Sequence, residues 1–270
     1  MIGSRGEQIV SPKALKIKML ELVLMKIREI EEKENIRVLH VIESGSRAWG
    51  FASPDSDYDV RFIYVRDKDF YLRLDDTRDV IEYPINDLLD INGWDISKTL
   101  KLICSSNPTL FEWLESPIVY KTTPEIEELR NISKNYFSKV KMVNHYYRIA
   151  LDHYDNYIRN KDEIKLKKYF YVLRSLSSAK YVLKNNTNPP IEFNNLRNIG
   201  IPNEYNHIVD ELLDMKINNS EKKIISRNKE LDAYIENEFK KLDKIVHEFA
   251  KEEEDKNWDL LNDYFKKILG

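Results

Sequence analysis

Residues 41–61 read VIESGSRAWGFASPDSDYDVR, and this stretch decides how the chain folds. A β-branched run, Ile36 to Glu43, leads into it and has the composition of a mostly buried strand. A turn-rich passage then separates that run from a second strand-like run, Tyr58 to Val65. Between the two, Gly45 lets the backbone approach a ligand closely because glycine has no Cβ. Gly45 and Ser46 therefore place backbone N–H groups and a hydroxyl where they can surround phosphate oxygens.

Two carboxylates enter the second strand at positions i and i+2. Asp57 and Asp59 come eleven and thirteen residues after Ser46, and the period of a strand points both side chains to one face. Like charges side by side repel each other unless a cation lies between them. Oxygen ligands beside a phosphate-bearing partner suit Mg²⁺ or Mn²⁺. A lone Asp-x-Asp is more often a polar turn, so the prediction depends on its combination with Gly45-Ser46.

These residues resemble the signature of the nucleotidyltransferase (DNA polymerase β-like) superfamily: Gly-Ser or Gly-Gly, then Asp-x-Asp on the next strand, then a third carboxylate. More narrowly, the chain looks like the YcgL/RlaP group of predicted nucleotidyltransferases, which are linked to RNA repair. The blocks that carry the likeness are GSRAWGFASPDSDYDVR, GWDISKTLKLICSSNPTLFEWLESPIVY and KKYFYVLRSLSSAKYV, the last followed by Pro-Pro. The likeness covers roughly residues 40–195.

The resemblance implies roles for the residues that match the signature. Gly45 and Ser46 would hold the triphosphate of an NTP, and Arg47 would be a further phosphate contact. Asp57 and Asp59 would bind metal, with two Mg²⁺ or Mn²⁺ ions expected. Such ions activate an attacking hydroxyl and neutralise the leaving pyrophosphate.

The third carboxylate would complete the second metal site and help deprotonate the acceptor hydroxyl. We choose Asp95 for both the catalytic and the metal-binding role, because it stands in a matching block and before a predicted helix. Asp90 is the alternative and Glu82 a more distant one. Asp95 also occupies the position of a helix N-cap, where aspartate is favoured without any catalytic role. If Asp95 points away from the Asp57 and Asp59 pair, Asp90 or another acid must take its place.

A basic segment, residues 159–184, carries eight basic and two acidic residues. Lys167, Tyr171 and Arg174 recur in it at helical spacing and would share a face that closes over a triphosphate. Lys168 and Arg174 are the two predicted nucleotide contacts. For most of the other lysines, a solvated face of an amphipathic helix is the simpler interpretation.

The pattern along the chain predicts an α+β protein. Strands are expected at 36–43, 58–65, 80–83 and 88–91, and helices at 11–33, 97–104, 125–159, 163–185, 203–217 and 221–254, with a short helix at the C-terminus and no strand after Pro124. We expect a polymerase β-like nucleotidyltransferase domain, a mixed sheet with helices, over residues 1–122. A helical domain over residues 123–270 would close the active-site cleft.

Charge and composition limit the class of protein. The net charge of -3, from 43 Lys+Arg and 46 Asp+Glu, averages two opposites, because residues 43–95 carry 13 acids and 6 bases whereas the segment 159–184 has a balance of about +6. Local fields of this kind leave RNA open as an acceptor. One cysteine, Cys104, excludes an intrachain disulfide. With no run of about 18 apolar residues, we expect no membrane partner and a cytoplasmic location.

The predicted reaction transfers an NMP from an NTP to a hydroxyl and releases pyrophosphate. The resemblance favours an RNA end as the acceptor. A protein hydroxyl, as in antitoxin-type enzymes, or a small molecule such as an aminoglycoside is the alternative. A non-catalytic nucleotide-binding protein is a further alternative, but an inactive copy has no physical reason to keep two carboxylates facing one another.

Overall fold

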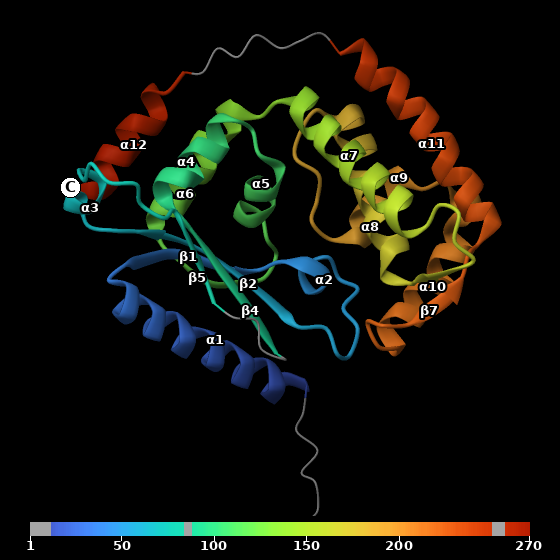
Figure 1. Ribbon diagram of the computed structural model, residues 1–270, viewed down its shortest axis with the longest axis horizontal. Coiled ribbons are helices and arrows are strands. Elements are labelled where there is room, and N and C mark those ends of the chain that lie inside the picture. The colour runs from blue at the N-terminus through green and yellow to red at the C-terminus, as the bar shows by residue number, and fades with distance from the viewer. Residues whose placement is uncertain (1–11, 84–87, 250–256) are drawn as a thin grey trace, which may run out of the picture.

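The first half of the chain is built on a five-stranded mixed sheet with the strand order β3-β4-β2-β1-β5 (Figure 1). The computed structural model describes residues 12–83, 88–249 and 257–270. The strands are β1 (Arg37–Glu43), β2 (Tyr58–Val65), β3 (Val80–Glu82), β4 (Leu89–Asp95) and β5 (Val119–Thr122). β2 is antiparallel to β1 and parallel to β4. β2 and β4 therefore begin at the end of the sheet where β1 finishes.

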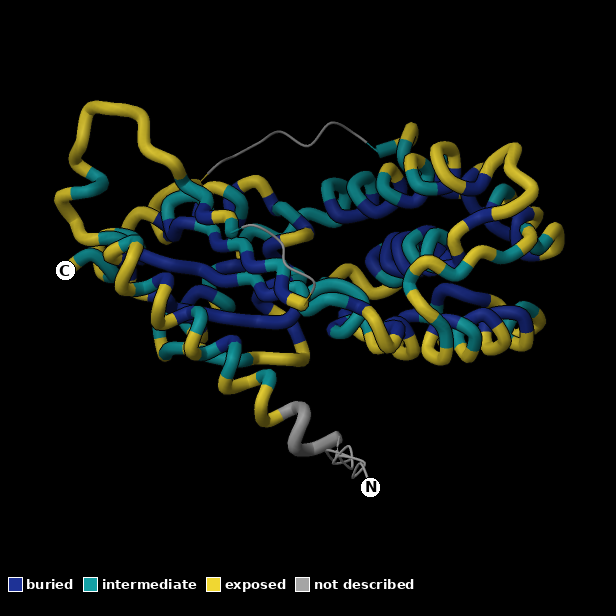
Figure 2. Tube along the Cα trace, turned by 60° about the horizontal axis from the view of Figure 1, so that its bottom comes forward, coloured by how far each residue is buried: buried dark blue, intermediate teal, exposed yellow. Residues whose placement is uncertain are grey.

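Helices cover both faces of this sheet. On one face α1 (Pro12–Glu34) buries Val23 and Ile27 against Val41 and Phe62. The opposite face carries α4 (Ile96–Cys104), α5 (Pro108–Leu114), α6 (Pro124–Ser133) and α12 (Asp259–Leu269). Two short helices, α2 (Gly45–Ala48) and α3 (Lys68–Tyr71), lie in the connections. Figure 2 shows the strands as a buried layer between these helices. α6 and α12 both follow residue 122 and still pack on the core of this sheet.

The rest of the chain forms a separate helical core. It contains α7 (Lys139–Tyr157), α8 (Lys167–Asn185), α9 (Phe193–Gly200), α10 (Asn206–Asn218) and α11 (Lys229–Glu248), with 3-10 turns at Lys134–Tyr136 and Asn203–Tyr205. A two-stranded sheet, β6 (Glu163–Lys165) and β7 (Ile224–Ser226), lies at its edge. Phe51 from the α2 connection enters this core, 5.0 Å from the ring of Phe170. The connection between β1 and β2 is therefore anchored in the helical region.

The α+β fold class is confirmed, and several element predictions are wrong in detail. The expected helix 125–159 is two helices, broken between Ser133 and Lys139. The strands β5, β6 and β7 and the helices α2, α3, α5 and α9 are additional, and the prediction of no strand after Pro124 is wrong. Strands of three or four residues are too short to show a period. Residues 84–87, between the strands expected at 80–83 and 88–91, lie outside the described residues.

In the described ranges, no helix has both the length and the apolar character needed to cross a bilayer.

Candidate active site

The acidic residues meet at one end of β2 and β4. In the parallel ladder Asp59 lies directly opposite Asp90, and Asp57 comes immediately before β2. The Arg61 Nη2 donates to Asp59 Oδ1 at 3.0 Å and to Asp90 Oδ2 at 2.7 Å. Adjacent strands thus bring two carboxylates to one guanidinium group.

Asp95, our choice for the third carboxylate, lies at the other end of the ladder between β2 and β4. It is paired with Tyr64, five residues along β2 from Asp59, and at about 3.3 Å per residue that is about 17 Å away. Its Oδ1 accepts a hydrogen bond from the Ser97 backbone N–H at 2.7 Å, and its Oδ2 accepts one from the Tyr71 hydroxyl at 3.0 Å. Asp95 is therefore the N-cap of α4, and the alternative, Asp90, is the acid beside Asp59.

Gly45 makes room for the Asp59 carboxylate. Its φ is +59°, and a Cβ at this position would lie 2.0 Å from Asp59 Oδ2. The backbone N–H of Ser44 donates to the carbonyl of Asp59 at 2.8 Å. The left-handed turn after β1 therefore lies directly against the acid on β2, and only glycine satisfies both the angle and the space.

The turn before β2 is held by Arg47. Its Nε donates to the carbonyl of Asp57 at 3.0 Å, and its Nη2 donates to that of Ser56 at 2.5 Å. The guanidinium lies 3.7 Å from the centre of the Tyr58 ring. Ser46 Oγ is 3.3 Å from Ser56 Oγ. Arg47 thus holds the backbone of residues 56 and 57 in place by hydrogen bonds to their carbonyl groups. The Ser46 hydroxyl lies beside the same turn.

Burial and mutual repulsion make two acids of the site bind protons more readily. Burial raises the pKa of Asp59 to about 6, Arg61 opposes the rise, and the charges of Asp57 and Asp90 add to it. Glu43, at the end of β1, is completely buried. Burial raises the pKa of Glu43 to about 7 against the effect of its hydrogen bonds, which it accepts from the Tyr120 hydroxyl and from the Asp59 backbone N–H.

The helical region faces this site through Lys167. Its Nζ donates to Glu221 Oε2 at 2.8 Å. Burial lowers the pKa of Lys167, but the hydrogen bond and charge of Glu221, with smaller effects from Tyr171 and Asp57, raise it overall. The charge of Asp59 likewise acts on Tyr171, whose pKa is raised mainly by burial. Lys167 and Tyr171, one turn apart on α8, therefore stand within the field of the carboxylates.

Glu221 ties the helical region to the turn before β2. Its Oε1 accepts from the Ser56 hydroxyl at 2.7 Å and from Lys216 Nζ at 3.1 Å. Its backbone N–H donates to Asp55 Oδ1 at 2.8 Å. The buried Lys216 also donates to Ser53 Oγ at 2.6 Å. One carboxylate thus joins two lysines to the loop that carries the acids.

Lys168 and Arg174, the two predicted nucleotide contacts, have other partners. Arg174 is buried, with Nη2 3.1 Å from Glu112 Oε1 and its guanidinium 4.4 Å from the centre of the Trp49 ring. Lys168 Nζ lies 3.4 Å from the centre of the Tyr157 ring. The lysine of α8 that is linked to the turn carrying Asp57, through Glu221 and Ser56, is Lys167.

The donor set suits a hard divalent cation, because Asp57, Asp59 and Asp90 offer only carboxylate oxygens. Over residues 12–83, 88–249 and 257–270, no three acidic, histidine or cysteine side chains are grouped so that they could hold a metal ion. At this site the Arg61 guanidinium donates to both Asp59 and Asp90. Burial, with smaller contributions from the charges of Asp57 and Asp90, raises the pKa of Asp59, and a bound cation would lower it again.

Three residues at the site were not chosen from the sequence: Glu43, Arg61 and Glu221. Arg61 carries a usable signal, since it follows Asp59 at i+2 on the same predicted strand. Lys167 was expected on the helical face of Tyr171 that closes over a triphosphate, although Lys168 was preferred as a nucleotide contact. Glu221 has no local signal, because its contacts with the loop that carries the acids join residues about 165 positions apart.

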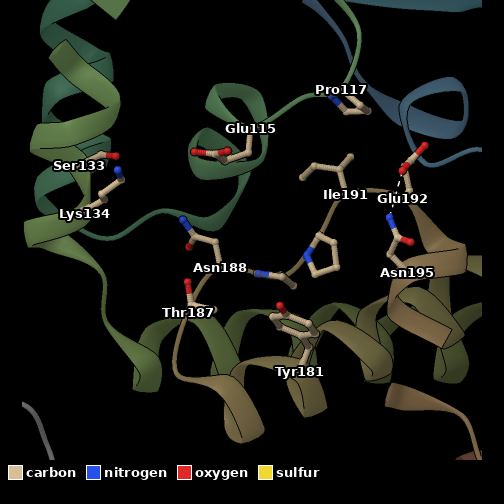
Figure 3. Close-up of a pocket in the computed structure, with 12 residues that line it drawn as sticks. Glu115, Pro117, Ser133, Lys134, Tyr181, Thr187, Asn188, Ile191, Glu192 and Asn195 are labelled. Atoms are coloured by element: carbon tan, nitrogen blue, oxygen red, sulfur yellow. Dashed lines mark hydrogen bonds between the residues drawn. The ribbon is translucent and has the colours of Figure 1, made fainter. Parts of the chain in front are cut away.

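A separate cleft of about 480 Å³ lies between the end of α5 and the segment after α8 (Figure 3). Glu115, Lys134, Tyr181 and Asn188 are among the residues that line it. None of the predicted site residues belongs to this lining. The cleft is thus distinct from the acidic end of β2 and β4.

Comparison with known proteins relates the chain to one family. The model of the RNA repair pathway DNA polymerase beta family matches residues 19–267. A protein of Bacillus subtilis (strain 168) called "Uncharacterized protein YcgL" is 39% identical over 240 residues, which cover 88% of this chain and 92% of that protein. A crystal structure of a nucleotidyltransferase-like protein from Exiguobacterium sibiricum 255-15 aligns with a TM-score of 0.30 at 12% identity, over 89% of this chain and 77% of that one. That score is too low to place any site residue.

Proposed function

Because this chain belongs to the RNA repair pathway DNA polymerase beta family, we propose that it is a metal-dependent nucleotidyltransferase that moves an NMP from an NTP to a hydroxyl at an RNA end. The observation that carries the proposal is the parallel pairing of Asp59 with Asp90, next to Asp57. Gly45 supports it, since the absence of a Cβ there leaves the space that the Asp59 carboxylate occupies.

The acids of the site would hold Mg²⁺ or Mn²⁺, with Asp57 and Asp59 as ligands and Asp90 joining them. Bound ions of this kind lower the barrier by activating the attacking hydroxyl and offsetting the charge of the leaving group. Arg61, which now donates to Asp59 and Asp90, would turn away from the position that the ion takes. Without a metal ion, the Arg61 guanidinium supplies the positive charge between these two acids.

The remaining groups of the site bind and orient the NTP. Ser46 offers its hydroxyl, and Lys167 offers a cation, to the triphosphate. In the transfer the acceptor oxygen forms a bond to the α-phosphorus, and the bond from that phosphorus to the bridging oxygen of pyrophosphate breaks. The hydroxyl proton passes to the Asp90 carboxylate. Holding donor and acceptor in line contributes to the rate because the reaction becomes effectively intramolecular.

The test uses the full chain with Mg²⁺ or Mn²⁺, each of the NTPs labelled at the α-phosphate, and RNA oligonucleotides with free or blocked 3′ ends. We expect labelled RNA and pyrophosphate only with a free hydroxyl. Asp57→Asn and Asp59→Asn should each lower transfer by about a hundredfold or more, as loss of a ligand or proton-transfer group does.

Asp76→Asn is the matched control, because it removes the same charge at an exposed position of the 66–79 connection. Its transfer rate should equal that of the unchanged chain. Label that appears on the protein itself or on an aminoglycoside, and not on RNA, would assign a different acceptor. If no acceptor is labelled, or if Asp57→Asn and Asp59→Asn transfer as fast as the control, the proposed function is wrong.

A further inference from the structure

A second, basic cleft lies beside the acidic site. It has a volume of about 540 Å³ and is formed where α7 ends, α8 begins and β6 pairs with β7. Its lining includes Lys161, Lys165, Lys167, Lys168, Tyr157 and Glu163. Four lysines thus share one cleft with a single acid.

The positive charge of this cleft is only partly compensated by its own contacts. Lys167 is paired with Glu221 at 2.8 Å. Lys161 Nζ donates instead to the carbonyl of Asn156 at 2.7 Å, and Lys168 lies over a tyrosine ring. Burial and the charges of the neighbouring lysines together lower the pKa of Lys168. Gathering like charges in this way is unfavourable, and a bound anion relieves it.

The start of α8 adds to the same field. Lys167 and Lys168 occupy the first turn of this 19-residue helix, which contains no acidic residue there. The N-cap is Leu166, whose side chain has no oxygen to accept from the first N–H groups. A helix N-terminus carries partial positive charge and favours anions. The partial positive charge at the start of α8 therefore adds to the charge of Lys167 and Lys168 and does not offset it.

A row of contacting aromatic side chains runs from the connection between β1 and β2 to the cleft. Trp49 contacts Tyr171 at 5.6 Å, Tyr171 contacts His153 at 5.0 Å, and His153 contacts Tyr157 at 5.6 Å between ring centres. Tyr157, at the end of the row, is 43% exposed. Lys167 belongs to the cleft and donates to Glu221, which also accepts from the hydroxyl of Ser56, the neighbour of Asp57. The cleft therefore lies beside the turn that carries Asp57.

We propose that this cleft binds the single-stranded RNA end that accepts the nucleotide, with Lys161, Lys165 and Lys168 against backbone phosphates and Tyr157 stacked on a base. Lysines along a groove with an aromatic platform are the features by which proteins hold single strands irrespective of sequence. The assignment rests on the proposed function, because it names the acceptor's path to the transfer site.

The test measures equilibrium binding of a fluorescent single-stranded RNA of about 12 nucleotides to the full chain, with no NTP or metal present. Affinity is followed between about 0.05 and 0.3 M KCl, because phosphate contacts make it depend on salt. The triple variant K161Q/K165Q/K168Q removes three charges from the cleft. The control K229Q/K240Q/K244Q removes three exposed lysines of α11. Circular dichroism establishes that both variants fold.

For the cleft variant we expect the slope of log affinity against log salt to become shallower by about 2, at about 0.7 for each lost phosphate contact. Binding at about 0.1 M salt should weaken roughly hundredfold. The control variant should keep both the slope and the affinity. Equal slopes in the two variants would overturn the proposal. In a separate titration with an NTP and Mg²⁺, loss of NTP binding by a cleft variant that retains RNA binding would also overturn it, since the cleft would then belong to the triphosphate.

Tyr157 gives an independent signature. Tyr157→Ala should weaken RNA binding about fivefold to a hundredfold, the range for one stacked base, with no change in the salt slope. Tyr157→Phe should retain the affinity of the unchanged chain. If Tyr157→Ala binds RNA as well as Tyr157→Phe does, the cleft does not hold a strand in this way. Because these measurements contain no transfer step, failure of the cleft and failure of the transferase are told apart.

Discussion

Gly45 is the residue whose replacement should act on both stability and chemistry. In Gly45→Ala the new Cβ meets Asp59 Oδ2 at 2.0 Å, so the carboxylate must move. A left-handed backbone at a non-glycine residue adds about 1–2 kcal/mol. We expect a lower free energy of unfolding by that amount or more in urea denaturation, together with loss of nucleotide transfer.

Gly50 supplies the control for this substitution. Its φ is +85°, and a Cβ there meets nothing within 4 Å. Gly50→Ala should therefore show the backbone penalty of about 1–2 kcal/mol without the loss of transfer. Equal effects of the two substitutions on transfer would contradict the role of Gly45 in seating Asp59.

The choice between Asp90 and Asp95 can be made with two isosteric changes. Asp90→Asn should lower transfer by about a hundredfold or more, because the acid opposite Asp59 is lost. Asp95→Asn should leave transfer unchanged, since asparagine caps a helix about as well as aspartate. Labelled-product formation by the two variants, side by side, measures this. Loss of transfer in Asp95→Asn alone would return the third role to Asp95.

Glu43 and Asp59 predict a fall of stability with rising pH in the absence of metal. Their folded-state pKa values, about 7 and about 6, lie above the ordinary values of 4.5 and 3.8. The folded state therefore holds more protons than the unfolded state, and the free energy of unfolding decreases as pH rises through this window. Glu221, with its pKa lowered to about 2, acts below that window and in the opposite sense.

The substitution Glu43→Gln measures how much Glu43 contributes to this pH dependence of stability. The amide cannot ionise, so the decrease in unfolding free energy between about pH 4.5 and pH 7 should shrink by a few kcal/mol. Urea denaturation at several pH values in that range checks it. An unchanged pH dependence would show that Glu43 is ionised in the folded protein.

At the scale of elements, the side chain of Glu221 joins the loop after α10 to the turn before β2. Glu221→Ala removes the acceptor for Ser56, Lys167 and the buried Lys216. A buried ammonium left with only a hydroxyl partner is unfavourable, and we expect about 1–3 kcal/mol of destabilisation. The exposed Glu211 on α10 provides the control, because Glu211→Ala should change the unfolding free energy by less than about 0.5 kcal/mol. Similar losses in both variants would contradict the link.

Elements with long periodic patterns could be predicted from the sequence, and those defined by pairing could not. The pattern identifies α1 over nearly its full length and places β1 and β2 within one residue. β6 and β7 exist because Ile164 and Ile225 pair across two distant segments. The same limit explains the third carboxylate, since only the register of β2 with β4 reveals which acid faces Asp59.

At the scale of the whole molecule, the C-terminal helix completes the core of the N-terminal sheet. Leu261 of α12 is 1% exposed, whereas its neighbour Leu260 is 46% exposed. Leu261→Ala should lower the free energy of unfolding by about 2–5 kcal/mol, and Leu260→Ala by less than about 0.5 kcal/mol. Urea denaturation measures both. Equal effects would mean that α12 does not pack on this core in solution.

The parallel ladder between β2 and β4 has a consequence for how such a protein can diversify. Asp59 and Asp90 are held opposite each other by strand pairing, while the intervening segment 66–79 is largely exposed. Long surface insertions add little to the entropy of closing a loop. The segment 66–79 can therefore lengthen, shorten or change composition, and so acquire new binding surfaces, while the distance between the acids stays the same.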